Sequence, residues 1–204
     1  MTDEISHEFV NANGLRFHVA TCGSGDRLAL CLHGFPECWY SWRHQLQAVS
    51  AAGFRAVAPD MRGYGGTQAP EPIDQYTLYH LVGDMAELVK TLGETRAVIV
   101  GHDWGAAISW QVVINRPDLV NKLVIMSVPH PAGFAREMAT NVDQQKNSQY
   151  ARNFQQPGFE KNFTAEGLAS MVAGREATPE KAEYVEAIWN VVDWAHVAAR
   201  FEAA

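Results

Sequence analysis

Short apolar segments alternate with helical segments over the first 130 residues, and this alternation limits the possible folds more than any other feature. Candidate strands cover residues 8–10, 15–20, 27–32, 54–58, 96–100 and 122–128. The spacing of apolar residues predicts helices over 41–52, 76–92 and 104–115. Asn13-Gly14 is a strong hairpin signal between the first two strands. Because strands that are separated by helices run parallel, the pattern predicts an α/β fold, with a mostly parallel sheet and flanking helices on both faces.

The alternation ends at Pro129-His130-Pro131, after which only helix and loop signals remain. We therefore expect an α/β core over residues 1–130 and a helical cap over residues 131–204. Thr178-Pro179-Glu180 predicts one helix start within this cap, because a capping hydroxyl precedes a proline at the first helical position. The helical spacing continues to the last residue without a stop signal, so we expect the cap to be incomplete and the chain to be a fragment of a longer protein.

Charge and composition exclude several classes of function. The chain has 16 Lys and Arg against 23 Asp and Glu, a net charge of −7, which argues against binding to nucleic acid or to an anionic membrane. It has no apolar run long enough for a membrane span and does not begin like a signal peptide, so we expect a cytoplasmic protein.

We interpret Cys31 as a buried core thiol rather than a zinc ligand. No metal and no cofactor are expected, because neither a Walker sequence nor a complete dinucleotide fingerprint is present.

The segment most informative about chemistry is RAVIVGHDWGAA, residues 96–107, in which an apolar strand runs through Gly101-His102-Asp103-Trp104-Gly105 into a helix. This is the pattern of a nucleophile elbow with Asp103 as the nucleophile. Gly101 and Gly105 are needed because a sharp strand-to-helix turn leaves no room for side chains there. The alternative is a tight turn in which Asp103 only caps the following helix. The position of the segment between a strand and a helix favours the nucleophile.

A second motif, HGFPE over residues 33–37, directly follows the third candidate strand. Where a strand-to-helix elbow carries the nucleophile, the oxyanion hole takes one N–H from the residue after the nucleophile and one from the loop after the third strand. Trp104 and Phe35 are therefore the candidate donors. We expect Gly34 to be part of the structural motif, His33 to bond the loop backbone rather than titrate, and the bond between Phe35 and Pro36 to be cis.

Together, HGFPE, DMRGYG over residues 60–65 and GHDWGAA over residues 101–107 resemble the α/β-hydrolase superfamily, and within it the epoxide hydrolase branch. The resemblance implies an enzyme in which Asp103 attacks an epoxide carbon, and water then cleaves the resulting alkyl ester. It implies that Tyr150, followed by FQQPG, is a cap tyrosine that hydrogen-bonds or protonates the departing oxygen. The implied partners are a small apolar epoxide and water. A carboxylate suits this chemistry, since it is ionised at neutral pH without a general base.

The acid and the histidine base that complete the triad of this fold are expected on loops after later strands, beyond Ala204. Attack on an epoxide without them is expected to proceed, and ester hydrolysis to stall. Two alternatives stay open. A haloalkane dehalogenase uses the same Asp elbow and binds halide through indole N–H groups, although Phe35 replaces the Asn usual in that family. The other alternative is an inactive hydrolase fold that serves as a binding protein.

Overall fold

In a computed structural model, residues 4–153 and residue 156 are described. The chain divides into two compact units, Met1–Val142 and Asp143–Ala204, and each is treated by itself. The predicted boundary at residue 130 immediately precedes the helix α4, Pro131–Thr140. The division into core and cap remains a prediction, and the helix expected at Thr178 lies outside the described residues.

The first unit is built on a sheet of six strands in the order β1-β2-β4-β3-β5-β6. Its strands are β1 Ser6–Ala12, β2 Leu15–Cys22, β3 Leu28–Leu32, β4 Arg55–Pro59, β5 Ala97–His102 and β6 Val120–Met126. Strands β3 to β6 pair in parallel, and the hairpin of β1 and β2 joins them antiparallel to β4. The predicted α/β fold with a mostly parallel sheet is confirmed.

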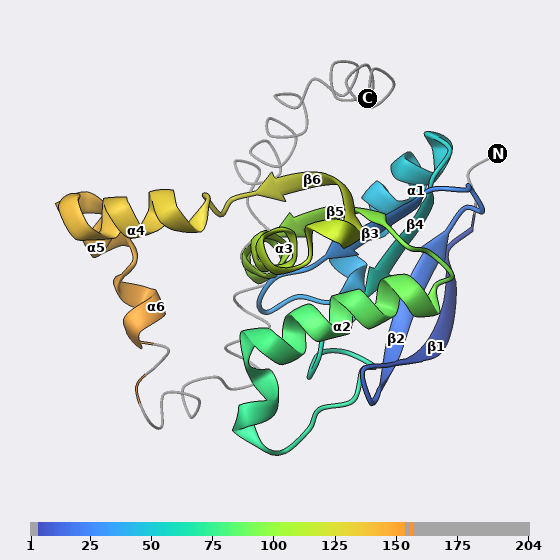
Figure 1. The fold of residues 1–204 in the computed structure, drawn as a ribbon, viewed down its shortest axis with the longest axis horizontal. Helices are drawn as coiled ribbons and strands as arrows, with labels where there is room; N and C mark the ends of the chain where they lie inside the picture. The colour runs from blue at the N-terminus through green and yellow to red at the C-terminus, as the bar shows by residue number, and fades with distance from the viewer. Residues whose placement is uncertain (1–3, 154–155, 157–204) are drawn as a thin grey trace, which may run out of the picture. The chain divides into compact units, whose positions relative to one another are not determined.

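Helices and short 3-10 turns connect the strands from β3 to β6 (Figure 1). In the first unit they are η1 Trp39–Trp42, α1 Arg43–Ala51, η2 Ile73–Tyr76, α2 Leu78–Thr91, α3 Trp104–Asn115 and η3 Pro117–Leu119. After α4 follow α5 Val142–Asn147 and α6 Gln149–Asn153. Along the described part of the chain, no helix is both long and apolar enough to cross a membrane.

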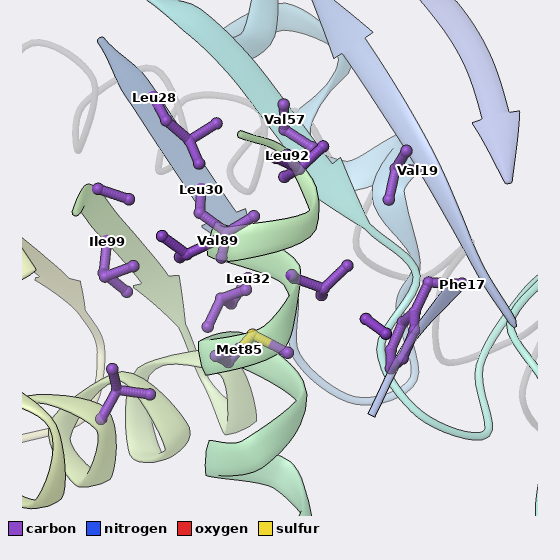
Figure 2. Packing of buried hydrophobic residues seen from close by; sticks show 14 of the residues in the cluster. Phe17, Val19, Leu28, Leu30, Leu32, Val57, Met85, Val89, Leu92 and Ile99 are labelled. Atoms are coloured by element: carbon purple, nitrogen blue, oxygen red, sulfur yellow. The ribbon is translucent and has the colours of Figure 1, made fainter. Parts of the chain in front are cut away.

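The larger core lies on the face of the sheet that α2 and α3 cover. Leu28, Leu30 and Leu32 point to this face because side chains alternate along β3, and they pack with Met85 and Val89 of α2 (Figure 2). A second cluster includes Cys22, Cys31, Ala56 and Ala58 of the sheet together with Trp42 and Leu46 from the η1–α1 segment. The sheet is therefore covered on both faces, as the alternation of strands and helices predicts.

Cys31 lies in this second cluster and is fully buried. Removal from water disfavours the thiolate and raises the pKa of Cys31 to about 12. The interpretation of Cys31 as a core thiol is confirmed.

Most element boundaries differ from the sequence expectation by one or two residues, and three of them have a clear physical reason. The strand expected over 8–10 extends to Ser6–Ala12, because polar residues at both ends pair with β2 in the hairpin register. The helix expected from residue 76 begins at Leu78, since Thr77 is extended with φ −71° and ψ 158°. The last strand begins at Val120 rather than Lys122, because Val120 pairs with Ala97 across an irregularity in the β5–β6 ladder.

Candidate active site

The predicted nucleophile, Asp103, lies between the end of β5 and the first residue of α3. Its backbone adopts φ 53° and ψ −121°, a strained conformation for a residue with a side chain. A Cβ at Gly101 would lie 2.6 Å from the Gly105 carbonyl oxygen, and one at Gly105 would collide with the carbonyl oxygen of Leu32. Both glycines therefore allow α3 to start directly against the strand ends.

The carboxylate of Asp103 meets the HGFPE loop. The backbone N–H of Phe35 donates a hydrogen bond of 3.0 Å to Oδ1 of Asp103. The Phe35–Pro36 peptide is cis, which confirms the sequence expectation. Trp104 is the first residue of α3, where backbone N–H groups have no partner within the helix, and its side chain is 53% exposed. Of the two predicted donors, the Phe35 N–H therefore contacts the carboxylate of Asp103, and the Trp104 N–H lies at the start of α3, directly after Asp103 in the chain.

His33 connects this loop to the segment after β4. Its Nδ1 donates to the Gly34 carbonyl oxygen at 2.8 Å, and its Nε2 accepts from the N–H of Met61 at 3.0 Å. The ring is fully buried, and burial lowers the pKa of His33 below its ordinary value. A neutral ring with both nitrogens bonded to backbone cannot exchange protons with a substrate, so the contacts support a structural role.

Glu37 and His102 form a pair that motif analysis did not assign to the site. The backbone N–H of Glu37 donates to the Gly34 carbonyl oxygen at 3.1 Å, which closes the loop as a turn. Its Oε2 lies 3.4 Å from the Gly34 nitrogen and 3.5 Å from His102 Nδ1. Glu37 thus links the HGFPE loop to the elbow. Glu37 belongs to the HGFPE motif and His102 to the GHDWGAA motif, and this membership was the sequence feature that could have indicated the pair.

Tyr64, from the DMRGYG segment, packs against His33. Its ring contacts the His33 ring edge-on, with centroids 5.0 Å apart. Burial, and secondly the negative charge of Asp103, raise the pKa of Tyr64. The three motifs that are separate in the sequence therefore converge around Asp103.

Tyr150, the predicted cap tyrosine, lies on α6 in the second unit, and its side chain is 59% exposed. Its role remains a prediction. Within the described segments, no group of three or more His, Cys, Asp or Glu side chains is arranged to hold a metal ion.

Comparison with known proteins places this geometry in a family. The sequence model of the family described as alpha/beta hydrolase fold matches residues 30–191, which contain both the HGFPE loop and the elbow. The chain belongs to the α/β-hydrolase fold family.

This α/β-hydrolase is similar to proteins named epoxide hydrolases. It is 42% identical over 180 residues to Epoxide hydrolase 2 of Siraitia grosvenorii, covering 83% of this chain and 54% of that protein. A crystal structure of an epoxide hydrolase from Vigna radiata matches with 45% identity and a TM-score of 0.66, over 76% of this chain and 49% of that one.

An epoxide hydrolase from Bacillus megaterium, solved in complex with an inhibitor, matches with 34% identity and a TM-score of 0.78, over 87% of this chain and 64% of that one. The chain spans about half the length of the curated relatives it matches. These matches confirm the resemblance to the epoxide hydrolase branch that the motifs predict.

The buried neutral His33 gives this α/β-hydrolase an acid-sensitive stability. Since its pKa is lower in the folded state, the unfolded state binds more protons as the pH falls below about 6.5, the ordinary value for histidine. The stability that neutral His33 contributes above that pH is lost as the pH falls. The free energy of unfolding then decreases by at most about 1.4 kcal/mol per pH unit. Urea denaturation at pH 7.5 and 5.5 measures the loss. His33→Gln, which keeps a donor and an acceptor, should show a smaller loss, and equal losses would contradict the assignment.

Proposed function

We propose that this chain carries the nucleophile of an epoxide hydrolase, which converts small apolar epoxides to diols through an alkyl ester on Asp103. The observation that supports this most directly is the Asp103 carboxylate at the elbow, with the N–H of Phe35 held 3.0 Å from its Oδ1. A carboxylate placed at the start of a helix beside a donor of this kind suits attack on a saturated carbon that bears a leaving group.

The hydrogen bond from Phe35 assigns different tasks to the two carboxylate oxygens. Oδ2 attacks an epoxide carbon, and the bond between that carbon and the ring oxygen breaks. The ring oxygen takes the electron pair and a proton, for which we propose Tyr150 as the donor. Oδ1 becomes the ester carbonyl oxygen, and the N–H groups of Phe35 and Trp104 form the oxyanion hole that stabilises its charge when water attacks the ester carbon. The bond between this carbonyl carbon and Oδ2 then breaks, and the diol leaves with Oδ2 and one proton from the water. The water oxygen completes the restored Asp103 carboxylate, and the other proton returns to Tyr150. We assign the activation of this water to no residue that the structure describes.

The surroundings of the elbow favour an apolar substrate. The Trp104 side chain is 53% exposed beside the reactive carboxylate, and the half-buried Phe35 belongs to the loop that holds it. Large apolar surface around a few directed polar groups is typical of sites for small molecules. Every step uses groups of the protein, the epoxide and water.

A haloalkane dehalogenase is the second candidate, because the exposed indole of Trp104 next to Asp103 is the kind of group that binds a leaving halide. Both reactions form an ester on the same Asp, but the masses of the two products differ. An epoxide adds its entire mass to the protein, whereas a haloalkane adds its mass less that of the hydrogen halide.

Intact-mass measurement of the chain after incubation with a small aryl epoxide, and separately with a bromoalkane, tests the proposal. We expect a persistent adduct with the full mass of the epoxide, mapped to Asp103 by peptide analysis, and no bromide release. Bromide release with alkylation would favour the dehalogenase. An unmodified chain in both reactions would contradict the proposed function and favour a binding protein.

Gly34→Ala is expected to slow this capture without unfolding the chain. An added Cβ would collide with that of Asp103 and lie 2.6 Å from Oδ1, so the loop and the carboxylate must move apart. A displacement of about 1 Å costs roughly 10- to 100-fold in rate. Time-resolved intact mass measures the rate. Gly133→Ala on α4 is the control, because its Cβ meets nothing within 4 Å and should leave the rate unchanged. Equal rates for the two variants would contradict the prediction.

We also propose that the enzyme is cytoplasmic. Cys22, Cys31 and Cys38 form no disulfide, and two of them are buried, which fits a reducing compartment.

A further inference from the structure

The candidate nucleophile Asp103 is hydrogen-bonded to a second residue with a strained backbone, Ser127. Among the described residues, the non-glycine residues with positive φ are Asn13, Asp103 and Ser127, with φ of 47°, 53° and 66°. Asn13 lies in the β1–β2 hairpin turn, where asparagine is commonly found in this conformation. The other two are hydrogen-bonded to each other, since the backbone N–H of Asp103 donates to Oγ of Ser127 at 3.3 Å.

The register of the sheet explains why a side chain makes this bond. Strands β5 and β6 pair in parallel up to His102 and Met126, so Asp103 and Ser127 are the next positions on the two strands. At φ 53° the backbone of Asp103 turns away from β5 to begin α3, and the regular ladder ends. The hydroxyl of Ser127 accepts from an N–H at the point where the ladder no longer supplies a strand carbonyl.

Ser127 itself adopts the left-handed conformation, which glycine enters with less strain than serine. Serine at this position costs more strain than glycine, but it supplies a hydroxyl that accepts a hydrogen bond, which glycine cannot do. Strain that is kept beside a reactive group is a reason to look for a function.

We propose that Ser127 is a positioning residue for Asp103. Asp103 is held at two points: the Ser127 hydroxyl accepts from its backbone N–H, and the Phe35 N–H donates to its Oδ1. These bonds fix the direction in which Oδ2 is presented to a substrate. Ser127 acts through Asp103, touches no reacting atom in this scheme, and matters for the rate of attack rather than for substrate binding. This inference rests on the proposed function of Asp103.

The test compares Ser127→Gly and Ser127→Ala with the parent chain, using the rate at which a small aryl epoxide alkylates Asp103. Both variants lack the hydroxyl, but only glycine relieves the strain at φ 66°. We expect both to lower the maximal alkylation rate about fivefold, the effect of one ordinary hydrogen bond, with the half-saturating epoxide concentration unchanged. The thermal midpoint should fall further for Ser127→Ala than for Ser127→Gly.

Ser6→Ala is the matched control, since Ser6 also makes an exposed 3.3 Å hydrogen bond to backbone, from its Oγ to the Thr21 carbonyl oxygen on the β1–β2 hairpin. It should alkylate at the parent rate. A parent rate in Ser127→Gly, or a rate that follows the thermal midpoint across the two Ser127 variants, would overturn the positioning role. Failure of the parent chain to form any adduct would instead refute the proposed function.

Discussion

Asp103→Asn is expected to abolish covalent capture of epoxides, with the rate of adduct formation falling on the order of 10⁴-fold. An amide oxygen carries no full negative charge, so it cannot displace the ring oxygen at a useful rate. Intact mass after incubation with a small aryl epoxide should show the adduct in the parent chain and none in the variant over the same period.

The same substitution should leave the fold intact, which makes the loss interpretable. The amide of Asn keeps an oxygen that can accept from the Phe35 N–H, as Oδ1 of Asp103 does at 3.0 Å. The side chain is half-buried, so no fully buried charge is removed. Thermal denaturation of the variant should match that of the parent. An adduct that persists in Asp103→Asn, or that maps to another carboxylate such as Asp60, would show that the nucleophile has been misassigned.

Asp84→Asn is expected to cause the largest loss of stability, about 3 to 5 kcal/mol in the free energy of unfolding. The Asp84 carboxylate is fully buried and accepts from Arg62 Nε at 2.8 Å, from an Arg62 terminal nitrogen at 2.6 Å, and from Asn13 Nδ2 at 2.8 Å. The Arg62 side chain is only 1% exposed, so neutralising its partner leaves a buried guanidinium without charge compensation. Urea denaturation of parent and variant measures the difference.

The exposed pair Glu87–Lys90 provides the control. Its side chains are 42% and 54% exposed, and Lys90→Ala should change the free energy of unfolding by less than about 1 kcal/mol. Replacing both members of the buried pair, as Arg62→Met with Asp84→Leu, should recover much of the loss, because no isolated charge remains. A loss for Asp84→Asn as small as that for Lys90→Ala would show that this network contributes little.

Much of the fold could be predicted because its signals are local. The apolar runs of β3 and β5, the Asn13-Gly14 turn and the glycines around Asp103 each reflect short-range backbone or packing requirements. Element ends were less accurate, as β1 shows. Its polar residues are held as strand by pairing with β2, a partner that the pattern of β1 alone does not reveal.

The candidate site also has a part that the sequence indicates and a part that it does not. The residue types and motif order alone indicate Asp103, Phe35 and Trp104, because an elbow requires a particular spacing of glycines around its nucleophile. The sequence by itself therefore determined the fold class, the elbow and the family resemblance.

Only the tertiary structure decided which residues hold Asp103 in place and which residues fix the segment after β4. The Ser127 hydroxyl reaches the Asp103 N–H across 24 positions of sequence, and the Arg62–Asp84 pair joins the segment after β4 to α2. Ser127 and Asp84 carry no local pattern that distinguishes them from surface residues. Their roles arise from parallel strand register and from burial, which depend on which distant segments pack together, and a linear sequence does not state these properties.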